Sequence, residues 1–235
     1  SLASITCNGI AAVFTQGQVS SQGLRLVLSG TRRVGSLPGG DGLTVLGGAS
    51  FDLDPGVNVR GAGSEIVGNA RVGVLVQNAG SSFSMRGTLV GANEATGLFI
   101  ANLATVSQVA ASEFSHNVGV GVAVATSTEL MDFRGNLVHD TQTGVVPGGT
   151  TMVGDGISAG NAAVGMVVGN TLSGNPRFAG IFSGARGTLS QNDGMDNGFR
   201  LYAYDSPGLT IDSTNRVQGR AEGAGRPAVT TEVPR

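Results

Sequence analysis

The sequence predicts an all-β protein folded as a parallel β-helix, a solenoid with coils of roughly 24 residues. A short pattern returns three times at a fixed interval: an Asn, then a Gly at the fourth position after it, and then apolar residues at alternate positions, starting at Asn69, Asn93 and Asn117. A fixed period in this range is typical of a solenoid, because one unit cannot bury its own apolar face. The 40 glycines and the 13% content of charged residues also fit a solenoid with tight corners and a small-residue core.

Each repeat has room for three strands. The first follows the repeated glycine, the second begins about half a repeat later, and the third precedes the next Asn. Two apolar columns support the later strands: Met85, Val109 and Val167 at one position, and Val90, Phe114, Leu137 and Leu172 at the other. Strands that recur in every coil stack about 4.8 Å apart and form parallel sheets along a tube.

The repeated Asn predicts a structural corner. Asn tolerates a left-handed backbone better than most residues, and its amide can bond to the neighbouring coil. We therefore expect Asn69, Asn93 and Asn117, followed by Asp140, to form a ladder of side chains. The glycines after them, Gly73 among others, predict positions where a side chain does not fit.

The repeat divides the chain into three parts. Residues 1–37 carry apolar runs without the repeat, and we expect an N-terminal cap with the first coil. Residues 38–217 form the parallel β-helix, and residues 218–235 are expected to be an extended or disordered tail. Gly144 follows Gly121 at nearly the same interval and still fits the period, whereas the remainder of 144–156 reads as a loop inserted into a coil, a place that often carries function.

The strand pattern with its Asn corner resembles the right-handed parallel β-helix repeat of the pectin-lyase-like superfamily, over roughly residues 40–217. The resemblance implies a right-handed coil. It does not imply one activity, because the superfamily includes polysaccharide lyases, glycoside hydrolases, uronate epimerases, phage tailspikes and adhesin passengers.

Composition argues against several functions. The net charge is −2 and the chain has no lysine, so we expect no nucleic-acid binding. Because no apolar run reaches about 18 residues, we also expect no membrane span. The catalytic segments of the family's hydrolases (Asn-Thr-Asp, Asp-Asp and His-Gly) are missing, and Asp54-Pro55 is followed by Gly56 where the family's epimerases have His. A lyase would need Arg134, Arg177 or Arg200 as its base. We expect no cofactor.

Two histidines form the first candidate catalytic site. His116 and His139 each stand one position before a predicted corner residue, which would place the imidazoles about 5 Å apart, as neighbours in a stack are. Glu113, Asp132 and Arg134 lie in the same two coils. Such a group can serve as acid and base or bind a transition metal. The alternative, which we favour, is a solvated corner without a metal, because the spacing brings only two ligands together.

A second candidate lies near the C-terminus. Sugar rings pack on exposed Tyr and Trp, and the chain has no Trp and two Tyr. Tyr202 and Tyr204, with Arg200 and Asp205, are the candidate polysaccharide-binding patch. The alternative is that they pack within the last coils.

The third candidate is an apolar column. Period two points the middle residue of each first strand outward, which predicts an exposed column of Leu75, Phe99, Ala123 and Phe182. An open apolar column would bind a protein partner or a second copy of the chain. The alternative is that the N-terminal cap or the tail covers it.

These observations favour a secreted or surface-displayed β-helix that acts as a structural or interaction module, similar to an adhesin or passenger. The alternative is a polysaccharide-active enzyme, a lyase, hydrolase or epimerase, on the same fold.

Overall fold

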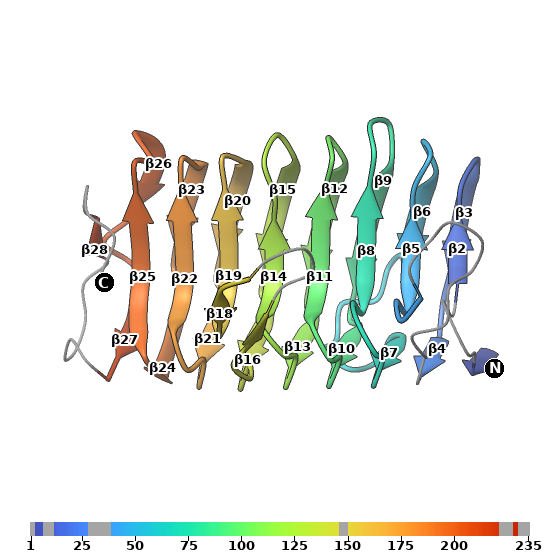
Figure 1. The fold of residues 1–235 in the computed structure, drawn as a ribbon, viewed down its shortest axis with the longest axis horizontal. Coiled ribbons are helices and arrows are strands. Elements are labelled where there is room, and N and C mark those ends of the chain that lie inside the picture. Colours follow the sequence, from blue (N-terminus) through green and yellow to red (C-terminus); the bar gives the residue numbers. More distant parts are fainter. Residues whose placement is uncertain (1–2, 7–11, 28–38, 146–149, 221–227, 230–235) are drawn as a thin grey trace.

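The computed structural model of the chain describes residues 3–6, 12–27, 39–145, 150–220 and 228–229. Within these ranges the chain forms strands and turns and no helix. Three long parallel sheets run along the molecule, and consecutive strands of the sequence belong to different sheets, so the chain winds as a right-handed parallel β-helix (Figure 1). The predicted fold class is confirmed.

Sheet A is the first of the three long sheets. Its strands, in spatial order, are β1 (Ala3–Thr6), β4 (Leu24–Val27), β7 (Glu65–Val67), β10 (Leu89–Gly91), β13 (Glu113–Ser115), β16 (Leu137–His139), β21 (Thr171–Ser173), β24 (Asp193–Asn197) and β27 (Arg216–Gly219).

Sheet B contains the strands that follow the repeated glycine. They are β2 (Ala12–Phe14), β5 (Leu43–Val45), β8 (Val74–Gln77), β11 (Thr96–Ala101), β14 (Val120–Val124), β19 (Asp155–Gly160), β22 (Phe178–Ser183), β25 (Phe199–Tyr204) and β28 (Ala228–Val229).

Sheet C completes each coil. Its strands are β3 (Gln18–Ser21), β6 (Ser50–Leu53), β9 (Ser82–Arg86), β12 (Thr105–Ala110), β15 (Glu129–Arg134), β20 (Ala163–Val168), β23 (Arg186–Ser190) and β26 (Gly208–Ile211). A small antiparallel hairpin, β17 (Gly144–Val145) with β18 (Met152–Val153), lies outside these sheets.

The core fills the tube between the sheets, because alternate residues of every strand point inward. Large apolar side chains meet there: the rings of Phe51 and Phe83 stack on paired strands with centroids 6.2 Å apart. The rings of Phe114 on sheet A and Phe133 on sheet C are tilted, with centroids 6.0 Å apart. Each fully buried side chain of this size stabilises the fold by about 1.5–3 kcal/mol.

Buried Asn side chains form a ladder at the corner between sheets A and B, as predicted. The Asn69 amide donates to Asn93 Oδ1 and the Asn93 amide donates to Asn117 Oδ1, each at 2.8 Å. The fourth position of the ladder was predicted wrongly. Thr141, which bonds to Asn175, occupies it instead of Asp140, and Val138 replaces Leu137 in the core.

The corners explain this one-residue error. The left-handed backbone belongs to the residue before each ladder position, with φ near +50° at Ala92, His116 and Asp140. That residue turns the chain, and the ladder side chain then points inward to satisfy backbone groups of its neighbours. Asp140 therefore stands at the turning position, outside the ladder.

A second ladder, which the sequence analysis missed, lies at the corner between sheets C and A. The side-chain amides of Asn136, Asn170 and Asn192 each donate to the amide oxygen of the next member, and Asn215 is the last acceptor, at 2.7–3.1 Å. Thr88 and Ser112 continue this row toward the N-terminus.

Gly73, Gly97 and Gly121 lie against the first ladder. A Cβ on Gly97 would lie 2.5 Å from the Gly121 carbonyl oxygen, so a side chain cannot fit. The next glycine in this column is Gly156, because Asp155 pairs with Val120. Gly144 was predicted to continue the strand pattern, but it belongs to the hairpin.

Two insertions interrupt the regular coils in the described part of the chain after β5. Between β6 and β7, residues 54–63 form a strap, where the next five coils have two-residue corners. Asp54 anchors it by accepting bonds from the backbone N–H groups of Gly23 and Ser64. The second insertion is the β17–β18 hairpin, which was predicted as a loop; its residues 146–149 lie outside the described ranges.

At the ends, β1, β2 and β3 form the first coil. Of residues 1–37, predicted as an N-terminal cap with the first coil, residues 1–2, 7–11 and 28–37 lie outside the described residues, as does most of the predicted tail. Within that tail, Ala228–Val229 pairs with β25 as a further strand of sheet B.

Candidate functional site

A polar column crosses the outward face of sheet C. Strand pairing aligns Asp52, Ser84, Gln108 and Asp132 on four successive strands. All four side chains are partly exposed. The column continues beyond Asp132 as Met166, which is exposed.

An aligned β-bulge shapes this face. The pairing between β9 and β12 shifts by one residue after Val106, which leaves Ser107 without a partner on β9. A second register shift lies between β20 and β23, where Gly165 has no partner on β23. A bulge bends its strand and redirects nearby side chains, so the face changes direction where β12 meets β9.

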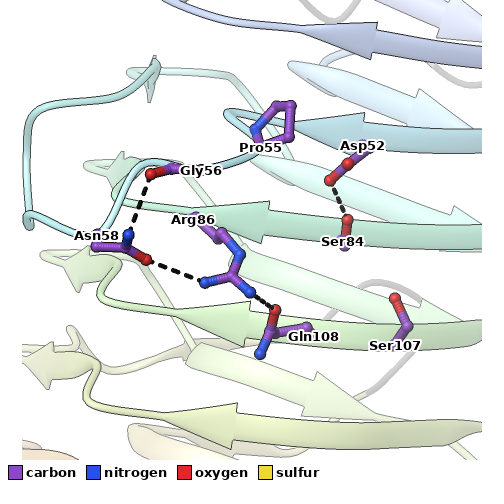
Figure 2. A pocket seen from close by; sticks show the side chains of 8 residues that line it. All are labelled: Asp52, Pro55, Gly56, Asn58, Ser84, Arg86, Ser107 and Gln108. Atoms are coloured by element: carbon purple, nitrogen blue, oxygen red, sulfur yellow. Dashed lines mark hydrogen bonds between the residues drawn. The ribbon is translucent and has the colours of Figure 1, made fainter.

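An open pocket of about 490 Å³ lies at this point. Figure 2 shows its lining: sheet C provides the floor, and the start of the 54–63 strap provides one wall. The lining residues are Asp52, Pro55, Gly56, Asn58, Ser84, Arg86, Ser107 and Gln108.

Hydrogen bonds fix most of the polar groups in the pocket. Arg86 donates from Nη1 to Asn58 Oδ1 at 3.1 Å and from Nη2 to Gln108 Oε1. Ser84 Oγ donates to Asp52 Oδ1 (Figure 2). The side chains are therefore oriented before a ligand binds.

The network continues past the pocket. Gln108 Nε2 donates to Asp132 Oδ2 at 2.8 Å, and Arg134 Nε donates to Asp132 Oδ1 at 2.7 Å. The hydrogen bond to Asp132 raises the pKa of Arg134 above its usual value. Asp132 and Arg134 were predicted to join the histidines, but their contacts are on sheet C.

The histidine pair lies on sheet A and its corner. The ring centroids of His116 and His139 are 5.8 Å apart, in an edge-to-face arrangement. His139 Nε2 lies 3.2 Å from Glu113 Oε1, and His139 Nδ1 lies 2.7 Å from Asp140 Oδ2. The predicted approach of Glu113 to the histidines is thus present in the structure, and Asp140 joins it. His116 is exposed, as in the solvated corner we favoured.

In the described part of the chain, no set of three His, Cys, Asp or Glu side chains is placed to hold a metal ion. His139 has both ring nitrogens engaged by carboxylates, which leaves neither of them open to a metal.

The predicted apolar column on sheet B is mostly covered. Leu75 is 5% exposed and Ala123 is 8% exposed, whereas Phe99 is partly exposed. Phe182 was wrongly placed: it lies in the core, and its neighbour Ile181 points outward. The inward direction of Phe182 follows from Gly180, which occupies the preceding inward position and leaves room for the Phe182 ring to lie against it.

The hairpin contributes to this cover. Val153 on β18 lines an apolar pocket of about 300 Å³ together with Phe99, Ala123 and Ser158 of sheet B. In Figure 1, β18 lies in front of sheet B beside β19.

The predicted aromatic patch is also partly buried. Tyr202 is 5% exposed, and its ring centroid lies 5.5 Å from that of Phe178, so its ring is not the exposed stacking surface we expected. Arg200 and Tyr204 share its strand and are partly exposed, and Asp205 is exposed at the next corner.

Two ion pairs with buried carboxylates lie at the edge of sheet B. Arg71 donates to both carboxylate oxygens of Asp41, and Arg177 donates to both of Asp155, at 2.5–2.8 Å. Burial raises the pKa of Asp155, and the Arg177 guanidinium opposes that shift. We assign both pairs a structural role, because each arginine clamps one coil to the previous one.

In comparisons with known proteins, no family model, no curated protein and no solved structure matches this chain. None of the described segments is a helix that could cross a membrane.

Proposed function

We propose that this chain is a secreted or surface-displayed β-helix that binds polysaccharide without cleaving it. We also propose that the chain is related to the pectin-lyase-like superfamily, which its repeat resembles, and that it acts outside the cell. One observation carries it: four polar side chains are aligned on successive strands of sheet C, and three of them, Asp52, Ser84 and Gln108, line a polar pocket.

The chemistry of the column suits a hydroxyl-rich chain. The carboxylate and amide groups of the column are planar and donate or accept hydrogen bonds side by side, and the hydroxyl of Ser84 both donates and accepts. Strand stacking repeats them about every 4.8 Å along the solenoid, so an extended polymer lying along the axis meets a new polar group in each coil. The bonds among these side chains also reduce the entropy lost on binding.

Distances argue against hydrolysis on this face. Asp52 and Asp132 are separated by three strand steps, or about 14 Å. The two carboxyl groups of glycosidases lie about 5–9.5 Å apart. These two carboxylates are therefore too far apart to act on one glycosidic bond.

A second candidate function is a polysaccharide-active enzyme, which the carboxylates around His139 favour. Glu113 and Asp140 are separated by one imidazole ring and two hydrogen bonds. That spacing is close to the ~6.5–9.5 Å of an inverting pair. The imidazole occupies the space where the attacking water would have to lie, which makes this the weaker candidate.

A polysaccharide panel tests the proposal. The intact chain should bind at least one polysaccharide without releasing reducing ends or unsaturated products, and Gln108→Ala should weaken that binding. His139→Ala should leave it unchanged. Cleavage that is lost in His139→Ala would establish the enzyme instead, and binding that is insensitive to Gln108→Ala would remove sheet C as the binding face.

A further inference from the structure

The pocket on sheet C contains one cation and one anion that do not neutralise each other. Asp52 accepts a hydrogen bond from the Ser84 hydroxyl, and no described Arg or His lies within ion-pair distance of it. Arg86 donates to two neutral amide oxygens, those of Asn58 and Gln108. Elsewhere, buried carboxylates form ion pairs: Asp41 pairs with Arg71, and Asp155 pairs with Arg177.

The side chains of Asp52 and Arg86 line the same pocket but form no ion pair with each other. Asp52 pairs with Ser84 on the neighbouring strand, and Arg86 follows two residues later on the same face. One strand step and two residues along the strand separate their backbones by about 8 Å. Arg86 has the reach to contact Asp52, but Asn58 and Gln108 hold its guanidinium on the other side of the pocket (Figure 2).

The strap helps to maintain this separation. Asn58 Nδ2 donates to the Gly56 carbonyl at 3.1 Å, which orients its Oδ1 toward Arg86. Further along, Arg60 Nη2 donates to the carbonyl of Gly135 at 3.2 Å and ties the strap to a later coil. The pocket thus presents a fixed positive end and a fixed negative end.

We propose that this pocket binds a zwitterionic unit, a residue whose ammonium group pairs with Asp52 and whose carboxylate pairs with Arg86. A ligand of this kind supplies the partner that each charge lacks, and guanidinium–carboxylate recognition is directional. The inference rests on the proposed polysaccharide function: the unit would be a sugar residue with a free amino group and an acidic substituent.

Four sugars separate the contributions of the two charges. Muramic acid carries both groups, N-acetylmuramic acid carries only the carboxylate, glucosamine carries only the ammonium, and glucose carries neither. Calorimetric titration of the intact chain should rank muramic acid first, about ten- to a hundredfold tighter than either singly charged sugar, as expected for one charge-assisted hydrogen bond. γ-Aminobutyrate, a zwitterion without a sugar ring, completes the set.

Two variants should change this ranking in opposite ways. Asp52→Asn should weaken muramic acid and glucosamine and leave N-acetylmuramic acid unchanged. Arg86→Gln should weaken muramic acid and N-acetylmuramic acid and leave glucosamine unchanged, and Arg86→Lys should restore part of the loss. Glu129→Gln and Arg186→Gln, an exposed pair on the same sheet outside the pocket, are the matched controls and should not alter the ranking.

The outcomes separate the two proposals. Equal binding of all four sugars would overturn the zwitterion proposal and leave polysaccharide binding standing. If γ-aminobutyrate binds and none of the four sugars does, the pocket recognises a zwitterion and the polysaccharide proposal is contradicted. If muramic acid and γ-aminobutyrate both fail to bind the folded wild-type chain, the zwitterion proposal is wrong.

Discussion

Sheets B and C belong to the same solenoid, yet their outward faces differ. The outward column of sheet B includes Leu75 and Ala123, which are buried although they point away from the tube. The corresponding column of sheet C, with Ser84 and Gln108, is polar and partly exposed. At Ala123 the hairpin accounts for part of this difference, because Val153 lines the same apolar pocket.

Each insertion acts on one face. The β17–β18 hairpin places Val153 against the outward face of sheet B. The 54–63 strap instead builds a wall at the edge of sheet C and leaves the sheet itself open. In this protein, the repeat provides the scaffold, and these two insertions shape the outward faces of sheets B and C differently.

The largest expected effect tests the direction of side chains on sheet B. Phe182→Ala should lower the free energy of unfolding by about 3–5 kcal/mol, because it empties a core position. Ile181→Ala is the matched control, since Ile181 points outward, and it should cost less than half as much. Equal costs in chemical denaturation would show that the assignment of the two neighbours is wrong.

The next prediction compares the two outward columns directly. Leu75→Ser should cost about 2–3 kcal/mol, because it places a hydroxyl in a covered apolar site. Ser84→Ala, at an open site on sheet C, should cost under about 1 kcal/mol. A Leu75→Ser variant as stable as wild type would mean that sheet B is open and that its apolar column is free to bind a partner.

The pH dependence of stability isolates the buried carboxylate at the edge of sheet B. The pKa of Asp155 is raised in the folded chain, so between its ordinary value of 3.8 and the folded value the folded state binds more protons than the unfolded state. Its contribution to stability is therefore present below pH 3.8 and is lost as the pH rises through the folded pKa.

Asp155→Asn removes this titration. The difference in unfolding free energy between wild type and Asp155→Asn should therefore shift against wild type as the pH rises above 3.8. Urea unfolding over a pH series measures it. Parallel profiles for the two proteins would show that Asp155 does not titrate in this way.

The smallest effect concerns the strap beside sheet C. Arg60→Ala removes one exposed hydrogen bond, to the Gly135 carbonyl, and should cost under about 0.5 kcal/mol. It should nevertheless speed proteolysis within residues 54–63, because the strap loses a tie to a later coil. Unchanged cleavage, with Arg25→Ala on sheet A as the control, would argue that Asp54 and Asn58 hold the strap without Arg60.

The sequence was sufficient to predict the solenoid, its period and the first Asn ladder, because strict spacing fixes which side chains stack. It failed where side-chain type was given more weight than spacing and where a small residue fills an inward position. Thr141 lies 24 residues after Asn117 and keeps the period, but Asp140 was chosen for its side chain. Gly180 hid the inward direction of Phe182.

The pocket on sheet C was missed for a related reason. Gln108 and Asp132 are 24 residues apart, a spacing that the repeat could have revealed. Asp52 and Ser84 are 32 residues apart, because the strap lengthens that coil. The contact of the strap with Arg86 depends on tertiary structure, which no local pattern encodes.

Methionine footprinting tests the central claim, that sheet C is the binding face, most directly. Met131 and Met166 are exposed on sheet C, whereas Met152 lies on the hairpin and Met195 on sheet A, both also exposed. With a bound polysaccharide, hydroxyl-radical oxidation of Met131 and Met166 should fall severalfold while Met152 and Met195 react as in the free protein. Protection of Met152 or Met195 instead, with Met131 and Met166 unprotected, would contradict the account.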